Sequence, residues 1–305
     1  MKQILLFSCL LIILSCQQKD NNAIDKPNLK PIQNQTLPTL PKEMELFGQK
    51  INLEDEDIKE RLDREILMNT YAQSATNLYI KRANRFFGPI EKILKKEQVS
   101  DDFKYLAVAE SGLANVQSPV GASGFWQFMP ATAKEYGLVI NDEIDQRLDL
   151  EKSTHAACQY LKNVNQEFNN WIMTAAAFNR GMGGVRSDMN RQYTTHYFDS
   201  EMNNETARYV FRIMALKIIM ENPKAYGYYI PNEQLYKPLE TKKIKVKSPI
   251  KNLALWSKNH GVNLKIVRKL NPWILKNSLM QMNKPQLLLL PGENCKLKNY
   301  ASYSK

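Results

Sequence analysis

Histidine and cysteine are scarce in this chain, which has three of the first and four of the second among 305 residues. The histidines, His155, His196 and His260, lie far apart and lack the spacing of metal ligands. A zinc or nickel site is therefore not expected, and we assign the chain no metal and no cofactor. Long internal repeats and a collagen-like or fully disordered composition are also absent, which leaves an ordinary globular composition.

The first fifteen residues combine a single lysine, Lys2, with a continuous apolar run. The run is too short to span a bilayer and no basic stop-transfer cluster follows, so we expect a signal peptide over residues 1–15. Ile-Leu-Ser-Cys at positions 13–16 resembles a bacterial lipobox, which predicts that Cys16 is lipidated. An uncleaved anchor or an ordinary signal peptide is the alternative. Gln17 favours the periplasmic face of the outer membrane.

Removal of the signal would leave Cys158 and Cys295 as the two free thiols of the mature chain. Two cysteines in an oxidising compartment can pair. Cys158 falls in a helical pattern and Cys295 in a polar tail, so we expect them to be separate.

Positive charge is in excess, with 42 lysines and arginines against 31 acidic residues and a formal net charge of +11. A basic balance favours an anionic partner. Nucleic acid has only this charge in its favour, so we do not expect it as a partner. Lipid head groups and the carboxylates of cell-wall peptides fit an exported, lipid-anchored chain better.

Changes of pattern divide the mature chain into four segments. The polar residues 16–45 carry scattered prolines and no apolar period, which is typical of a tether. Residues 46–232 have apolar residues at helical spacing and no clear alternating strands, so we expect a mainly α domain. Residues 233–292 predict a small β-α-α-β module, and residues 293–305 form a polar tail.

Local signals place the elements of both folded segments. In the helical domain, Ser100 is expected to cap a helix that ends at Glu110. Later helices are expected after Asp149, over Trp171–Asn179 and over Glu205–Met220.

In the small module, Lys243–Lys247 and Gln286–Leu290 read as strands. Ser248-Pro249 has the form of a helix start, with a cap followed by proline, and Asn263 is expected to begin a second helix.

Glu110 closes its helix on the face that carries Phe103, Leu106 and Ala107. Burial beside apolar groups disfavours the charged carboxylate, and the negative end of the helix dipole acts in the same direction, so the pKa of Glu110 should be raised. A carboxylic acid that is still protonated near neutral pH suits a general acid for a glycosidic oxygen. Taken alone, a helix-end glutamate is more often a surface residue.

Four ordered motifs favour the catalytic interpretation, and they span Glu110–Gly112, Ser118–Pro130, Ala176–Gly181 and Glu205–Val210. Together they resemble the family 1 lytic transglycosylases, in the membrane-bound D-like branch. The resemblance covers roughly residues 71–225. It implies a goose-type, lysozyme-like helical domain that acts on the glycan strands of peptidoglycan.

The resemblance also implies roles for single residues. Glu110 matches the catalytic acid of the family. The substrate-binding positions correspond to Ser111, Ser118, Gln127, Met129, Phe178, Asn179, Glu205 and Tyr209. Phe178 departs from the pattern, because the family has tyrosine before the asparagine that matches Asn179, so a hydroxyl is lost here.

The residue types suit these roles. Gly121 and Gly124 permit close approach of the backbone to a ligand. Gln127 offers donors and acceptors for sugar hydroxyls and N-acetyl groups. We expect Trp126 in the core, whereas for Tyr209 we weigh core packing and stacking on a sugar ring equally.

A second catalytic carboxylate is missing from the motifs, although ordinary glycosidases use two. Asp142 and Asp145 are near only in sequence, and we expect Asp145, Arg147 and Asp149 to fix a loop and a helix cap. The resemblance implies instead that Glu110 serves as acid and then base, while the 6-hydroxyl of muramic acid attacks C1 to give a 1,6-anhydro product. A goose-type hydrolase and an inactive peptidoglycan-binding lipoprotein are the alternatives.

The small module resembles a degenerate LysM repeat, through Trp256, the Gly261–Asn263 turn and Leu270–Trp273. Such repeats bind N-acetylglucosamine chains. The usual Gly-Asp-Thr start is replaced by Lys247-Ser248-Pro249, so glycan binding and simple packing against the helical domain are weighed equally.

Overall fold

The computed structural model describes residues 40–282, 284–297 and 299. The expected signal peptide, Cys16 and the tether up to residue 39 lie outside these residues. Among the described residues, no helix is long and apolar enough to cross a bilayer.

The described chain opens with a β-hairpin that the sequence analysis did not anticipate. Strands β1 (Glu43–Leu46) and β2 (Gln49–Asn52) pair antiparallel. Phe47 and Gly48 form the turn with φ values of 53° and 78°, and this left-handed backbone is the kind that closes two-residue hairpins. Phe47 stacks on Phe103 with 4.1 Å between ring centroids, which anchors the hairpin in the core. Residues 43–45 thus belong to a strand rather than to the expected tether.

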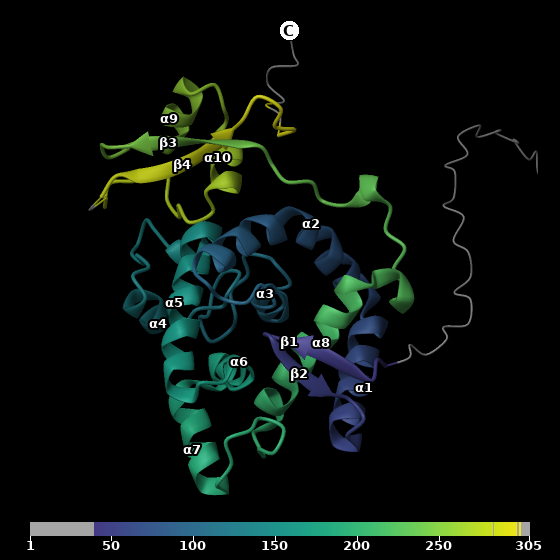
Figure 1. Ribbon diagram of the computed structural model, residues 1–305. Coiled ribbons are helices and arrows are strands. Elements are labelled where there is room, and N and C mark those ends of the chain that lie inside the picture. Colours follow the sequence, from purple (N-terminus) through teal and green to yellow (C-terminus); the bar gives the residue numbers. More distant parts are fainter. Residues whose placement is uncertain (1–39, 283, 298, 300–305) are drawn as a thin grey trace, which may run out of the picture. The chain divides into compact units, whose positions relative to one another are not determined.

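The expectation of a mainly α domain is confirmed (Figure 1). Within the described residues the helices of this domain are α1 (Glu56–Tyr71), α2 (Gln73–Lys96), α3 (Phe103–Ser111), α4 (Pro130–Glu135), α5 (Leu150–Phe168), α6 (Trp171–Arg180), α7 (Met182–Gln192) and α8 (Asn204–Glu221), with 3₁₀ turns η1 (Gln146–Leu148), η2 (Pro223–Tyr226) and η3 (Asn232–Gln234). Cys158 is buried in α5 and Cys295 is partly exposed, and neither forms a disulfide.

Helix α8 is the most deeply packed element near the candidate site. It contacts α1, α3 and α6 (Figure 1). Side chains from Thr206 to Ile219 are buried around most of its circumference. A helix that is apolar on nearly all sides belongs in a core. Its first turns therefore lie directly beside the end of α3, where Glu110 is located.

The start of α3 differs from the expected serine cap. The helix begins at Phe103, after a turn, and the hydroxyl of Ser100 accepts a 3.4 Å hydrogen bond from the backbone N–H of Asp102, which lies before the helix. The carboxylate of Asp102 has a different role, because it accepts from the N–H of Phe47 at 2.7 Å and from the ammonium of Lys217 at 2.6 Å. Asp102 thus joins the hairpin and α8 to the start of α3.

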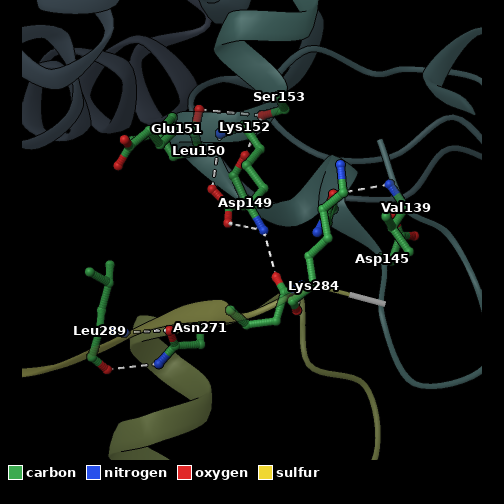
Figure 2. Close-up of polar contacts among 12 residues, drawn as sticks. Val139, Asp145, Asp149, Leu150, Glu151, Lys152, Ser153, Asn271, Lys284 and Leu289 are labelled. Carbon is green, nitrogen blue, oxygen red and sulfur yellow. Dashed lines mark hydrogen bonds and ion pairs between the residues drawn. The ribbon is translucent and has the colours of Figure 1, made fainter. Parts of the chain in front are cut away.

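The other helix starts expected in the helical domain are confirmed to within one residue. Asp149 accepts from the N–H of Lys152 at 3.0 Å and caps α5 (Figure 2). Helix α6 extends one residue beyond the expected Asn179, and α8 exceeds its expected range by one residue at each end. Short polar side chains at these starts satisfy backbone N–H groups that the helix itself leaves unpaired.

The C-terminal module has the expected β-α-α-β order. Strands β3 (Thr241–Val246) and β4 (Gln286–Pro291) pair antiparallel, and α9 (Leu253–Asn259) and α10 (Leu264–Leu270) lie between them in sequence. Asn271 follows α10 and binds both the N–H and the C=O of Leu289, at 2.7 and 2.8 Å (Figure 2).

The expected helix start at Ser248-Pro249 is wrong. Ile250 pairs instead with Leu279 through two backbone hydrogen bonds of 3.0 and 2.8 Å, and its side chain is buried, so the chain stays extended there. Asn252 is the actual cap of α9 and accepts from the N–H of Leu255. The cap of α10 at Asn263 is confirmed.

The module is joined to the helical domain through residues 143–145. Ile144 is fully buried within the apolar core of the module. The N–H of Asp145 donates to the carbonyl of Trp273 at 2.9 Å. The buried carboxylate of Glu143 accepts from the N–H groups of Met280 and Gln281, at 2.7 and 2.8 Å. These contacts show that the module packs against the helical domain.

Candidate active site

Glu110 lies in the last turn of α3, as the sequence indicates. The expected apolar face of this helix is fully buried at Phe103, Leu106 and Ala107. Gly112 ends the helix with a φ of 57°, and a Cβ at this position would come within 2.4 Å of the Tyr79 ring. Only glycine fits such a backbone and such a contact, so the helix stops two residues after Glu110.

The surroundings of Glu110 shift its ionisation strongly. Burial raises the pKa of this carboxyl to about 7, against an ordinary value near 4.5, and the negative charge of Glu205 acts in the same direction. A hydrogen bond from Tyr209 and the positive charge of Arg212 oppose the rise without cancelling it. The carboxyl thus takes up and releases protons near neutral pH, as a group that acts as both acid and base must.

Tyr209 contacts this carboxyl directly. Its hydroxyl donates a short hydrogen bond to Oε1 of Glu110. The tyrosine is only 1% exposed, and burial together with the charge of Glu110 raises its pKa well above the ordinary value, so it remains a donor. A fully buried ring cannot stack on a sugar. The structure therefore decides between the two roles weighed for Tyr209 in favour of the core.

Glu205 and Arg212 form an exposed pair on the same helix as Tyr209. Nη1 of Arg212 lies 3.1 Å from Oε1 of Glu205, whose side chain is 57% exposed. Arg212 did not appear among the residues indicated by the sequence. Its spacing gave a usable signal, because it stands three residues after Tyr209 and seven after Glu205, which places all three on one side of a helix.

Asn179 ties the end of α6 to the first turn of α8. Its Oδ1 accepts from the hydroxyl of Thr206 at 2.8 Å. The backbone N–H of Thr206 in turn donates to the cap residue Asn203 at 2.8 Å. Within the described part of the chain, the side-chain NH₂ of Asn179 has no protein acceptor, so its two donors are free for a ligand.

Ser111 and Ser118 stabilise the loop that follows α3. The hydroxyl of Ser111 donates to the carbonyl of Phe125 at 2.9 Å. The hydroxyl of Ser118 accepts from the N–H of Ala122 at 3.0 Å. Both serines thus position the backbone of this loop, and a direct contact of either one with substrate stays a prediction.

Gln127 also stabilises this loop, and its backbone is left-handed, with a φ of 46°. Its Nε2 donates to the carbonyls of Val116 and Gly124, at 3.0 and 2.8 Å. A Cβ on Gly124 would lie 2.0 Å from the carbonyl oxygen of Arg147, so this glycine permits close approach to protein backbone rather than to a ligand. Gly121 faces open space, and ligand approach there stays a prediction.

Arg147 holds the loop from the other side. It pairs with Asp145 at 2.7 Å and donates to the carbonyls of Gly121 and Phe128 at 2.7 and 3.0 Å. The expected structural role of this pair is confirmed. Asp142 has a side chain that is 82% exposed and lies 3.8 Å from Lys276.

Asp142 and Asp145 have no influence on the pKa of Glu110, and the acidic residue that raises this pKa is Glu205. The structure therefore brings no second carboxylate from the 142–145 segment to the reactive group.

Met129 and Phe178, the last two expected substrate-binding residues, differ in exposure. Met129 is 43% exposed, directly before α4. Phe178 is half-buried and lies among the rings of Trp126, Phe128 and Tyr160, with centroid distances of 6.4, 6.2 and 5.2 Å. Trp126 is fully buried, as expected for a core residue. The apolar ring of Phe178 suits this aromatic cluster, which explains how the chain accommodates the loss of the hydroxyl.

Comparison with known proteins places these features in a family context. Residues 89–200 match the model of the transglycosylase SLT domain, and residues 242–291 match the C-terminal LysM-like domain of soluble lytic transglycosylases. The matched SLT segment includes Glu110 and the loop behind it.

Relatives of the chain carry corresponding names. The chain is 26% identical over 247 residues to the membrane-bound lytic murein transglycosylase D of Escherichia coli, covering 79% of this chain and 53% of that protein. It is 37% identical over 109 residues to the soluble lytic murein transglycosylase of the same species, covering 33% of this chain and 17% of that one. The chain therefore spans about half the length of the first relative.

Among solved structures, the 70 kDa soluble lytic transglycosylase of Escherichia coli is similar with 26% identity and a TM-score of 0.37, over 49% of this chain and 25% of that one. The match to the SLT model includes the motifs on α3 and α6, whereas α8 lies beyond its last residue. Residues 89–200, within the mainly α part of the chain, thus form a transglycosylase SLT domain, and residues 242–291 form a LysM-like domain.

Proposed function

We propose that this protein is a peptidoglycan lytic transglycosylase, which cleaves the bond between N-acetylmuramic acid and N-acetylglucosamine. The observation that carries the proposal is the buried Glu110 carboxyl, with a pKa of about 7, in an SLT domain. The names of the relatives support the same reaction and the same polymer.

In the proposed reaction Glu110 acts twice. Its carboxylic acid first donates its proton to the glycosidic oxygen, and the bond from C1 to that oxygen breaks. The 6-hydroxyl of the same muramic acid then attacks C1, and its proton passes to the Glu110 carboxylate. The product is a 1,6-anhydro sugar and no water is consumed. One carboxyl suffices because the substrate supplies the nucleophile, in contrast to glycosidases with two carboxylates.

The neighbours of Glu110 support this cycle. The Tyr209 hydroxyl holds the carboxyl in one orientation and stabilises its charged form after the first step. The free NH₂ of Asn179 offers donors for carbonyl and hydroxyl oxygens of the glycan. We assign substrate contacts to Asn179, Glu205 and Met129, which keep exposed atoms, and a supporting role to Ser111 and Gln127 through the loop.

We also propose a place for the protein in the cell envelope. The apolar run and the Ile-Leu-Ser-Cys motif support export and lipidation of Cys16, and Gln17 supports the outer membrane. A membrane-bound relative is consistent with an envelope protein. Labelling of cells with a radioactive fatty acid tests the anchor. Loss of the label in a Cys16→Ala variant is expected, and retention of the label would exclude this cysteine as the modified one.

The activity test compares three proteins that begin at Asp20 and therefore retain every described residue: the unmodified chain, Glu110→Gln and Asp142→Asn. Each is incubated with purified peptidoglycan, and the released muropeptides are analysed by mass spectrometry. Asp142→Asn is the matched control, because it removes an exposed carboxylate with no contact to Glu110.

We expect anhydro-muropeptides from the unmodified and Asp142→Asn proteins and none from Glu110→Gln. Products with a free reducing end would indicate a hydrolase. Binding to the polymer without any release would indicate a scaffold, and either result would overturn the proposal.

A further inference from the structure

The excess positive charge of the chain is concentrated in its LysM-like domain. Residues 242–291 contain ten lysines and one arginine, and no aspartate or glutamate. They therefore carry the whole formal net charge of +11, and the remainder of the chain has equal numbers of basic and acidic residues. A surface with a single sign of charge attracts anionic polymers and repels cationic ones.

Only part of this charge is used to hold the domain in place. Lys243 pairs with Glu151 on α5 at 2.6 Å, and Lys276 lies 3.8 Å from Asp142. These acidic partners belong to the helical domain. Exposed pairs of this kind contribute little to stability. Attachment to the helical domain thus involves two of the lysines, and among the described residues no other lysine of this domain has an ion-pair partner.

Three of the remaining lysines, Lys245, Lys247 and Lys251, line one hollow together with residues of β3 and α9. The hollow has a volume of about 510 Å³ and its lining contains no acidic residue. Among the residues that the structure describes, none of the three lysines has an ion-pair partner. Three ammonium groups around one recess repel each other and favour an anionic ligand.

The rest of the lining is suited to more than a bare anion. Trp256 stacks on His260 with 3.9 Å between ring centroids, and Asn259 adds an amide. Leu255 is 54% exposed at the same hollow. Aromatic and apolar surfaces pack on sugar faces and alkyl groups, whereas amides bind peptide or N-acetyl groups. This combination matches an acidic glycopeptide better than an isolated phosphate.

We infer that this hollow, called the lysine hollow below and defined by Lys245, Lys247, Lys251, Trp256 and His260, binds carboxylate-bearing peptide stems of peptidoglycan. The inference rests on the proposed function, which supplies the polymer. The amide of Asn259 and the aromatic and apolar side chains beside the three lysines favour a carboxylate carried on a peptide over a lipid phosphate. Binding through peptide carboxylates would hold the enzyme on its substrate through a group other than the sugars.

The test measures retention on purified sacculi by sedimentation, with the Glu110→Gln protein so that the polymer is not cut. One variant replaces the three lysines of the hollow by glutamine (K245Q/K247Q/K251Q). The matched control removes the same charge from exposed lysines of the domain that do not line the hollow (K265Q/K269Q/K284Q). A second substrate has its carboxyl groups converted to neutral amides, which leaves the glycan intact.

We expect the hollow variant to bind native sacculi about tenfold more weakly, as three exposed ion pairs of ordinary strength imply. The control variant should lose less than about twofold. The Glu110→Gln protein with its three lysines intact should bind amidated sacculi as weakly as the hollow variant binds native sacculi. Equal losses in both triple variants, or undiminished retention on amidated sacculi, would overturn the inference.

Vesicles that contain phosphatidylglycerol provide the comparison with a membrane. Binding to vesicles through the hollow lysines, with retention on native sacculi unchanged, would assign the site to lipid and reject the inference. The proposed function is judged by a different readout, the release of anhydro-muropeptides by the protein with Glu110 intact. Retention that depends on the lysines, without release, would reject the function and keep the binding site.

Discussion

Two carboxylates of the helical domain, the buried Asp145 and the partly buried Glu110, have opposite kinds of partner. Asp145 faces the guanidinium of Arg147, which neutralises its charge and fixes the loop behind α3. Glu110 faces the hydroxyl of Tyr209, which carries no charge, and burial raises its pKa to about 7. A cation therefore makes a buried carboxylate structural, whereas a neutral donor leaves its proton available for chemistry.

The largest expected difference between the two carboxylates is in stability. Asp145→Asn would leave the buried guanidinium of Arg147 without its counter-charge, and the free energy of unfolding should fall by about 3 kcal/mol. Glu110→Gln keeps an acceptor for Tyr209 and removes an acid from a site that disfavours its charge, so it should cost little. Urea denaturation at pH 7 measures both values. Equal losses in the two variants would contradict the comparison.

We expect the ionisation of Glu110 to cause the main change in stability between pH 5 and pH 8. Its pKa is about 7 in the folded protein and near 4.5 when unfolded, so between these values the folded state holds a proton that the unfolded state has lost. Stability therefore decreases as pH rises from 4.5 to 7, by up to about 3 kcal/mol, and then levels off. Thermal unfolding at pH 5 and pH 8 should show this loss in the unmodified chain and not in Glu110→Gln. The same slope in both proteins would assign it to another group.

Removal of the Tyr209 hydroxyl should increase the difference between Glu110 and Asp145, because Glu110 would then lose its hydrogen-bond donor. The hydrogen bond from Tyr209 lowers the pKa of Glu110, so Tyr209→Phe should raise this pKa further and move the basic limb of the kcat/KM profile to higher pH. At pH values below this pKa, kcat/KM should fall about tenfold, because the variant loses one hydrogen bond to the charged carboxylate. Tyr160→Phe is the control, because that hydroxyl donates to the carbonyl of Ala177 and not to Glu110. An unchanged profile in Tyr209→Phe would show that the contact does not act on catalysis.

The smallest expected effects come from the exposed pair on α8. Arg212 lowers and Glu205 raises the pKa of Glu110 through space. Arg212→Gln should therefore move the basic limb of the rate profile up, and Glu205→Gln should move it down. Both shifts should shrink in high salt, because exposed charges are screened. Shifts in the same direction would contradict the opposite effects of these two charges on the pKa of Glu110.

Helical spacing in the sequence predicted the apolar surroundings of Glu110, whereas its catalytic role came from the family resemblance and stays a prediction. Helical spacing places Phe103, Leu106 and Ala107 on its side of α3, and all three are buried. The same reasoning correctly placed Trp126 in the core. Such patterns are local, because a helix fixes which residues share a face once its start and end are known.

The features that sequence reasoning missed depend on contacts between distant segments. The partners of Asp102 come from the hairpin and from α8, and the extended backbone at Ile250 depends on pairing with Leu279. Gly124 was expected to face a ligand, but it lies against the backbone of Arg147. No local spacing reports such neighbours, and a short turn signal such as Ser248-Pro249 loses to a long-range strand contact.

The most direct test of the role of Glu110 is cleavage of peptidoglycan in water enriched in oxygen-18, followed by mass spectrometry of the muropeptides. If the 6-hydroxyl of muramic acid is the nucleophile and Glu110 the only acid and base, the anhydro products should carry no label and Glu110→Gln should release none. Reducing-end products that carry one oxygen-18 atom would show that water attacks C1, and the single-carboxylate mechanism would be contradicted.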